Sequence, residues 1–257
     1  MKLLMKLAIA ALALALPLSA AQAETIKVGI AAEPYPPFTV PDASGHWGGW
    51  EIDIMQAVCK AADLTCKVTP VSWDGIIPAL KSGKIDMIFN SMSITADREK
   101  EIDFSDKYYN TPTVIVGQES EHFKPTPEGL KGKILGVQVS TVHEAYARKH
   151  FPDATIKVYQ TQDEANQDLV AGRIDATQAD GVAMAAFLKS SDGKSCCDLK
   201  GDVAPDKAIL GPGVGAGIRK GDTKLKDKIN AAIKKIRADG AYQKISKKYF
   251  DFDIYGG

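Results

Sequence analysis

The sequence predicts an α/β protein of two related lobes, each a parallel sheet covered by helices on both faces. Short β-rich runs alternate with helical patterns along most of the chain, which is typical of parallel strands joined by crossover helices. The pattern L-x-x-G-K/R-I-D occurs at residues 80–86 and again at 169–175, each time where a helix ends at glycine and a strand follows. This repeat indicates two lobes that each present one strand end to a shared cleft.

Residues 1–23 have the parts of a secretory signal peptide. Two lysines precede an apolar run over residues 7–16, and Ala21–Ala23 form an A-x-A cleavage site. We expect cleavage before Glu24 and export of the mature chain. No later apolar run reaches the roughly 18 residues of a membrane span, so we expect the mature chain to be soluble.

Composition and motifs exclude several classes of function. The mature chain carries 30 lysines and arginines against 32 aspartates and glutamates, without a basic block, which argues against nucleic acid and anionic membranes as partners. The four histidines show no metal-ligand spacing, and no G-x-S-x-G motif is present in the sequence. We therefore expect no catalytic residues, no metal and no cofactor.

In the first half of the chain, hydrophobic periodicity and glycine punctuation define the elements. Strands are predicted at residues 25–31, 66–71 and 84–89, and helices at 50–62 and 73–83. The first helix places Ile52, Met55 and Val58 on one face, and Gly83 stops the second helix.

The second half repeats this order. Strands are predicted at residues 133–139, 155–160 and 173–178, and helices at 141–151, 162–172, 180–190 and, broken at Gly240, over 222–250. The glycine-rich run at 211–217 is not followed directly by a helix, as a dinucleotide-binding loop requires. We interpret it as an inter-lobe strand with close backbone packing.

A cluster of hydroxyl residues precedes Arg98: Ser91, Ser93 and Thr95. Thr95 is placed to cap a helix, which puts Arg98 in the first turn, where the helix dipole disfavours a cation. A bound carboxylate would resolve this conflict, because it can accept the guanidinium fork and free backbone N–H groups. The alternative is a solvated arginine paired with Asp97 or Glu101.

Two further helix starts are candidates for the same cleft. Thr141 and Glu144 match a capping box, and Ser140 precedes them, so these residues either cap the helix alone or also bind the carboxylate. Asp180 lies five residues after the aspartate of the second repeat, as Ser91 does after the first. Asp180 either caps its helix or also accepts a ligand ammonium group.

Aromatic residues and cysteines leave further alternatives. Tyr35, in a proline-rich loop, and Trp73, before a helix, either pack locally or form walls for an apolar or cationic side chain. For an exported chain, Cys59 and Cys66 are plausible disulfide partners, although two free thiols remain the alternative. The adjacent pair at positions 196 and 197 would bond only with backbone strain, and without histidine it makes no zinc site.

Five stretches carry a resemblance to a known family: GWEIDIMQAVCK, WDGIIPALKSGKIDMI, SMSITADREKEIDFSDKYY, GVQVSTVHEAYA and KKYFDFDIYG. From about Ile26 to Tyr255 the chain resembles the type 2 periplasmic solute-binding proteins of ABC importers for polar amino acids. The likeness is to lysine/arginine/ornithine- and histidine-binding proteins, with opine-binding proteins close to them. It implies a monomer in the periplasm that delivers an amino acid to an inner-membrane permease.

The resemblance also implies an architecture and site residues. The lobes would be residues 24–112 with 205–257, and residues 113–204, joined by a two-segment hinge around the cleft. In the family, residues matching Ser91, Ser93 and Arg98 hold the ligand α-carboxylate and α-ammonium. Those matching Ser140, Thr141, Asp180, Tyr35 and Trp73 complete the site, and the family disulfide corresponds to Cys59 and Cys66.

The chain departs from the family pattern where side-chain specificity would be set. An acid three residues before the tyrosine is replaced by Ala32, with Glu33 beside it, and Asn90 stands where several members have serine. Val139 and Val142 replace frequent glycine and glutamine. We expect a cationic or neutral polar ligand in contact with Asn90, and an opine stays open. Glu33 is the candidate contact for a cationic tip, with a glutamate that simply faces water as the alternative.

Two rival functions are considered beside the receptor, and the first of them rests on the same resemblance. A periplasmic dehydratase-like enzyme could use Glu33 or Glu51 as an acid, and Glu51 could alternatively meet the cationic tip of a ligand or face water. A sensor domain would need membrane-spanning and signalling segments that the sequence lacks.

Overall fold

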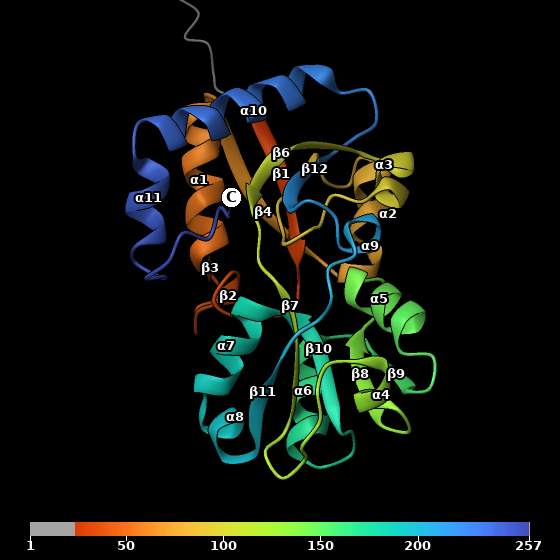
Figure 1. The fold of residues 1–257 in the computed structure, drawn as a ribbon. Helices are drawn as coiled ribbons and strands as arrows, with labels where there is room; N and C mark the ends of the chain where they lie inside the picture. The colour runs from red at the N-terminus through yellow and green to blue at the C-terminus, as the bar shows by residue number, and fades with distance from the viewer. Residues whose placement is uncertain (1–23, 257) are drawn as a thin grey trace, which may run out of the picture.

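The computed structural model describes residues 24–256 and folds them into two lobes, one above the other in Figure 1. Each lobe is built on a five-stranded sheet, which confirms the predicted α/β class. The predicted signal peptide, residues 1–23, lies outside the described residues.

The first lobe has the strand order β4-β1-β5-β12-β6. Its strands are β1 (Glu24–Ala31), β4 (Leu64–Val71), β5 (Met87–Ile88), β6 (Asp103–Tyr109) and β12 (Val214–Ile218), with a small ribbon of β2 (Val40–Pro41) and β3 (Trp47–Gly48). Its helices are α1 (Trp50–Ala61), α2 (Ile76–Lys81), α3 (Ala96–Glu101), α10 (Thr223–Ala238) and α11 (Ala241–Ser246), with a 3-10 turn at Trp73–Gly75. Met87 packs with α1 and α10 in one core, and Ile88 packs with α2 in another, so both faces of the sheet are covered.

The second lobe has the strand order β9-β8-β10-β7-β11. Its strands are β7 (Thr113–Gln118), β8 (Ile134–Gln138), β9 (Thr155–Tyr159), β10 (Ala176–Asp180) and β11 (Cys197–Asp202). Its helical segments are α4 (Pro127–Leu130), α5 (Val142–His150), α6 (Gln162–Val170), α7 (Gly181–Lys189) and α8 (Ser191–Cys196). The short α9 (Lys207–Leu210), which the predicted boundary at 205 assigns to the first lobe, packs against α5.

The repeated sequence pattern plays the same structural part in both lobes. Asp86 accepts a hydrogen bond from the backbone N–H of Lys27 in β1, at 2.9 Å. Asp175 accepts the equivalent bond from Ile134 in β8, at 2.6 Å. Strand directions also correspond throughout the two sheets, so the lobes share one topology.

Each sheet departs from the predicted parallel arrangement at one strand. In the first sheet β12 runs antiparallel to β5 and β6, and in the second β7 runs antiparallel to β10 and β11. The strand β7 follows β6 of the first sheet after only three residues, and β12 follows β11 of the second sheet. Neither strand is therefore reached by a helical crossover within its own sheet, the connection that parallel neighbours need.

The glycine-rich run lies elsewhere than the sequence predicts, although its predicted close backbone packing is confirmed. It forms β12 inside the first sheet rather than a strand between lobes. A Cβ on Gly215 would lie 3.0 Å from the carbonyl oxygen of Ser105, so the close backbone packing that was predicted is present.

Gly49 fixes where α1 begins. Its φ is 110°, and a Cβ there would lie 2.4 Å from the carbonyl oxygen of Phe38, so only glycine fits. The turn places Trp50 and Glu51, both fully buried, at the start of the helix. Trp50 then packs among the aromatic rings of the first lobe.

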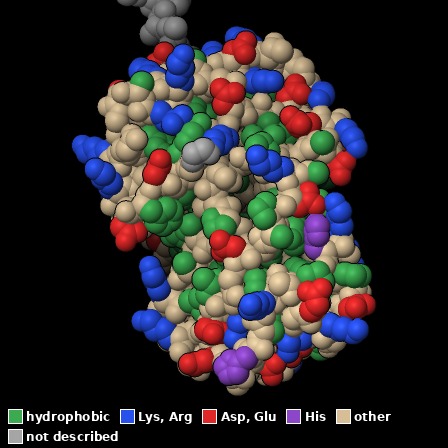
Figure 2. All heavy atoms as spheres, viewed as in Figure 1, with side chains coloured by type: hydrophobic (Ala, Val, Ile, Leu, Met, Phe, Trp, Pro, Cys, Tyr) green, Lys and Arg blue, Asp and Glu red, His purple; other side chains and the backbone are tan. Residues whose placement is uncertain are grey.

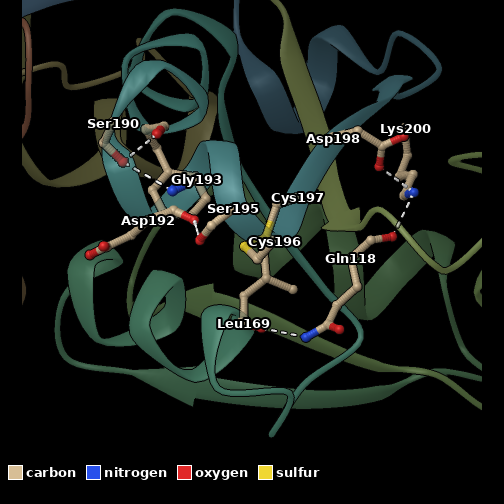
Figure 3. Close-up of a disulfide and its surroundings, with 11 residues drawn as sticks. Gln118, Leu169, Ser190, Asp192, Gly193, Ser195, Cys196, Cys197, Asp198 and Lys200 are labelled. Atoms are coloured by element: carbon tan, nitrogen blue, oxygen red, sulfur yellow. Dashed lines mark hydrogen bonds and ion pairs between the residues drawn. A yellow bond between two sulfur atoms is a disulfide. The ribbon is translucent and has the colours of Figure 1, made fainter.

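All four cysteines are bonded. Cys59 and Cys66 join the end of α1 to β4 across a Cα–Cα distance of 6.1 Å, which confirms the predicted pair. Cys196 and Cys197 also form a disulfide, a pairing that the sequence leaves open. Figure 3 shows it where α8 gives way to β11, so the two residues belong to a helix end and a strand start.

The surface shown in Figure 2 carries lysine, arginine and acidic side chains interspersed, without a field of one sign. Among residues 24–256, no helix combines the length and apolarity needed to cross a membrane. The same residues contain no cluster of histidine, cysteine and acidic side chains arranged to hold a metal ion.

Candidate functional site

A cavity of about 730 Å³ lies between the lobes and is lined by residues of both. The structure brings nine of the ten predicted site residues to it: Glu33, Tyr35, Trp73, Asn90, Ser91, Ser93, Arg98, Thr141 and Asp180. Ser140 is exposed and is not part of the lining, although its backbone carbonyl contacts Arg98.

Arg98 spans the two lobes at this cavity. Its backbone N–H is capped by the Thr95 hydroxyl at 3.3 Å, as predicted for the start of α3. Its guanidinium donates to the carbonyl of Ser93 at 3.0 Å in the first lobe and to that of Ser140 at 3.1 Å in the second. The guanidinium carbon lies 5.5 Å from the ring centroid of Trp73.

The alternative of a solvated, ion-paired Arg98 is wrong. Asp97 pairs with Lys100, and Glu101 pairs with Lys81. Within residues 24–256 no carboxylate lies in ion-pair distance of Arg98. Burial lowers the pKa of Arg98 to about 10, because its charge is poorly solvated. A poorly solvated cation without a protein counter-ion is a strong site for a small anion.

The start of α5 faces the same cavity with hydrogen-bond donors. Thr141 caps the helix, accepting from the backbone N–H of Glu144 at 3.1 Å and donating to the carbonyl of Gln138 at 2.7 Å. Among the described residues, no acceptor is bonded to the backbone N–H groups of Val142 and His143. These N–H groups carry the positive end of the helix dipole, which favours an anion beside them.

The capping box predicted at this helix is only half formed. The Glu144 carboxylate accepts from the backbone N–H of Ser140 at 2.8 Å, one residue earlier than the pattern requires. Ser140 has a φ of 59°, and this left-handed turn brings its N–H round to Glu144. A complete box forms instead at α6, between Thr161 and Glu164.

Asp180 adds a buried carboxylate to the cavity lining. It ends β10 and caps α7, accepting from the backbone N–H groups of Val182 at 2.8 Å and Ala183 at 3.3 Å. The hydroxyl of Thr111 donates to its second oxygen. Burial raises the pKa of Asp180 to about 6, and these bonds oppose the rise. Three donors occupy three of roughly four acceptor positions of a carboxylate, which leaves one for a ligand cation.

Ser91 is held from behind by Glu51. The Glu51 carboxylate accepts from the backbone N–H of Ser91 at 2.6 Å and from its hydroxyl at 3.1 Å. Glu51 is fully buried and is not part of the cavity lining. It therefore neither meets the cationic tip of a ligand nor faces water, and both of these expectations from the sequence are wrong.

The remaining lining residues differ in what they offer. One Glu33 oxygen and the indole N–H of Trp73 are buried without a hydrogen-bond partner among the described residues. The Tyr35 ring stacks on Phe38 with centroids 5.8 Å apart. Asn90 is 4% exposed and its side-chain oxygen accepts from the backbone N–H of Ala31 at 3.0 Å, so it also supports the wall of the cavity.

Sequence reasoning missed His143, which lines the cavity together with Arg98 and Asp180. Its Nδ1 lies 3.3 Å from the hydroxyl of Thr113. Burial, with the Arg98 charge as a smaller cause, lowers the pKa of His143 to about 3, so the imidazole is neutral near pH 7. Metal-ligand spacing does not find this residue, whereas its position two residues after the helix cap Thr141 is a signal that the sequence does contain.

Comparison with known proteins now identifies the family. A model of the bacterial extracellular solute-binding proteins, family 3, matches residues 26–252. The chain belongs to that family. An L-arginine-binding protein of Pseudomonas aeruginosa is 42% identical, over 97% of this chain and 96% of that protein. The histidine-binding periplasmic protein of Escherichia coli K12 is 40% identical, over 98% of this chain and 100% of that protein.

Solved structures of solute-binding proteins share the fold. An ancestral arginine-binding protein bound to arginine has a TM-score of 0.81 and 35% identity, covering 89% of this chain and 99% of that one. An ancestral amino acid-binding protein described as a precursor of cyclohexadienyl dehydratase has a TM-score of 0.77 and 32% identity, covering 88% and 95%. The chain therefore has the two-lobed type 2 periplasmic binding-protein fold.

Proposed function

We propose that this solute-binding protein captures a free amino acid with a cationic side chain in the periplasm and delivers it to an ABC transporter permease. The observation that carries the proposal is Arg98, a poorly solvated cation with no carboxylate partner among residues 24–256. Together with the N–H groups at the start of α5, it forms a receptor for one carboxylate.

A zwitterion fits the charges that line the cavity. Its α-carboxylate would lie against Arg98 and the first turn of α5, and its α-ammonium against Asp180 and Ser91. Since Arg98 already contacts both lobes, a bound carboxylate would replace carbonyl contacts with a charged one and hold the lobes together.

Preference for a cationic side chain rests on Glu33, Trp73 and Tyr35. The unpartnered Glu33 oxygen is an acceptor in need of a donor, and the aromatic faces favour a guanidinium or an extended stem between them. The names of the relatives agree, because they bind arginine and histidine.

Delivery would follow closure of two lobes, which we place at residues 24–112 with 205–257 and residues 113–204. The packing of α9 on α5 supports moving the proposed return crossing of the hinge from residue 205 to about Gly211, so that α9 moves with the second lobe. We propose that the protein acts as a monomer and that the permease recognises the closed form.

A second candidate is an enzyme on the same fold, because one structural neighbour is described as a dehydratase precursor. We favour the receptor, since the neighbour itself is described as an amino acid-binding protein. Of the two acids that the enzyme alternative could use, Glu51 lies outside the cavity lining and is engaged by protein donors, which leaves Glu33 alone at the cavity.

Calorimetric titration tests the proposal. The panel is the twenty amino acids with ornithine, citrulline and opines, and chromatography of the bound ligand follows. We expect arginine-like amino acids to bind at least about tenfold more tightly than glutamate or aspartate, and to be recovered unchanged. Tightest binding of glutamate, or conversion of the ligand during incubation, would overturn it.

A further inference from the structure

Hydrogen bonds behind the cavity wall determine whether the Ser91 hydroxyl donates or accepts toward the cavity. A serine hydroxyl has one hydrogen to donate and two positions at which to accept. Ser91 donates that hydrogen to Glu51 at 3.1 Å, and its backbone N–H is also donated to Glu51, at 2.6 Å. Toward the cavity, Ser91 therefore offers oxygen acceptors alone.

The surrounding fold fixes Glu51 as the acceptor for the hydrogen bonds from Ser91. It is fully buried in the first turn of α1, and the hydroxyl of Tyr108 in β6 donates to the same carboxylate. Burial raises its pKa to about 7, while the bonds from Tyr108 and Ser91 lower it. The carboxylate thus receives three donors, all of which favour the ionised form.

Ser91 is itself held in an uncommon backbone conformation. Its φ is 45°, in the left-handed region that a serine seldom adopts. The two bonds to Glu51 stabilise that conformation, which places Ser91 in the cavity lining just beyond the end of β5. Removing the acceptor would free both the hydroxyl and the turn.

We propose that Glu51 is a positioning residue that fixes Ser91 as a hydrogen-bond acceptor and so selects ligands carrying an α-ammonium group. The inference rests on the proposed function, because it assumes that an amino acid occupies the cavity. The polar lining of the cavity then has two parts. Arg98 and the start of α5 donate hydrogen bonds to the ligand α-carboxylate, whereas Ser91 and Asp180 accept them from the ligand α-ammonium group.

The variant Glu51→Gln reverses the relevant bond. An amide nitrogen donates to the Ser91 oxygen, which turns the serine hydrogen toward the cavity and against an ammonium group. The shape of the side chain is kept. Asp53→Asn is the matched control, since Asp53 lies in the same turn of α1 but contacts Lys248 and Tyr249 at the surface.

The test compares L-arginine with 5-guanidinopentanoate, which is arginine without its α-amino group, by calorimetry. We expect Glu51→Gln to weaken arginine binding at least about tenfold, equal to about 1.4 kcal/mol, and to leave the analogue within about twofold. Asp53→Asn should leave both affinities unchanged. Equal weakening of both ligands in Glu51→Gln would show a merely structural role and overturn the proposal.

Ser91→Ala covers the case in which Glu51→Gln does not fold. Ser91→Ala removes the hydroxyl that accepts from the ammonium group. It should therefore reduce the ratio of the arginine affinity to the analogue affinity by a similar factor. In the Ser91→Ala background, Glu51→Gln should reduce this ratio little further. An unchanged preference in Ser91→Ala would also overturn the proposal. If the wild-type protein binds no cationic amino acid at all, the proposed function fails; if it does bind one and the preference survives both variants, only the part assigned to Glu51 fails.

Discussion

Replacing Arg98 with alanine should remove most ligand binding while leaving the protein folded. In the structure the guanidinium contacts two backbone carbonyls and no carboxylate among residues 24–256, so the substitution leaves no protein charge unpaired. We expect a change in the free energy of unfolding of no more than about 1 kcal/mol, or a shift in Tm of about 2–4 °C for a chain of this size.

The effect on binding should be far larger. Truncating one partner of a desolvated charge pair costs about 2–5 kcal/mol, which is roughly 30-fold to several thousand-fold in affinity. Arg98→Lys should fall between the wild type and Arg98→Ala, because it keeps the charge and loses the bidentate fork.

The assay is calorimetric titration with L-arginine, with Tm measured in parallel. Arg173→Ala is the control, since this exposed arginine pairs with Asp168 and is not part of the cavity lining. The reasoning is refuted if folded Arg98→Ala binds arginine with wild-type affinity, or if Arg173→Ala loses as much affinity as Arg98→Ala.

Three further outcomes are expected. Affinity for arginine should fall as the pH is lowered below about 6. Burial raises the pKa of Asp180 to about 6, so below that pH its carboxylate takes up a proton and loses the charge that faces the ammonium group. Calorimetric titrations between about pH 5 and 8 check this, and an affinity that does not change with pH would contradict it. Glu33→Gln should weaken arginine more than its neutral isostere citrulline, and equal weakening would remove Glu33 from the side-chain pocket. Thiol titration of the denatured, unreduced protein should find no free cysteine, and labelling at Cys59 or Cys66 would contradict the structure.

The predictable part of the fold is the part whose signal is local. Helix α1 carries an apolar stripe over three turns, and it begins at the predicted residue and ends at Ala61, one residue early. Gly240 breaks the last two helices as expected. Strand β6 escaped prediction because its partner β12 lies about a hundred residues later, so its stability comes from long-range pairing that sequence periodicity does not contain.

The residues of the candidate site likewise include some with a local sequence signal and one without. Helix caps and strand ends predict Arg98 and Asp180, because a polar residue at such a position carries a local conflict or a local role. Glu51 could not be placed, since an acid in the first turn of a helix is already explained by the dipole. Only tertiary structure shows that its partner is Ser91, forty residues along the chain.

Binding of agmatine, which is arginine without its α-carboxylate, tests the central claim most directly. If Arg98 and the start of α5 receive the ligand carboxylate, wild-type protein should bind L-arginine at least about 30-fold more tightly than agmatine in calorimetric titrations. Agmatine and arginine binding with equal affinity would contradict the claim that this cavity recognises an amino acid by its carboxylate.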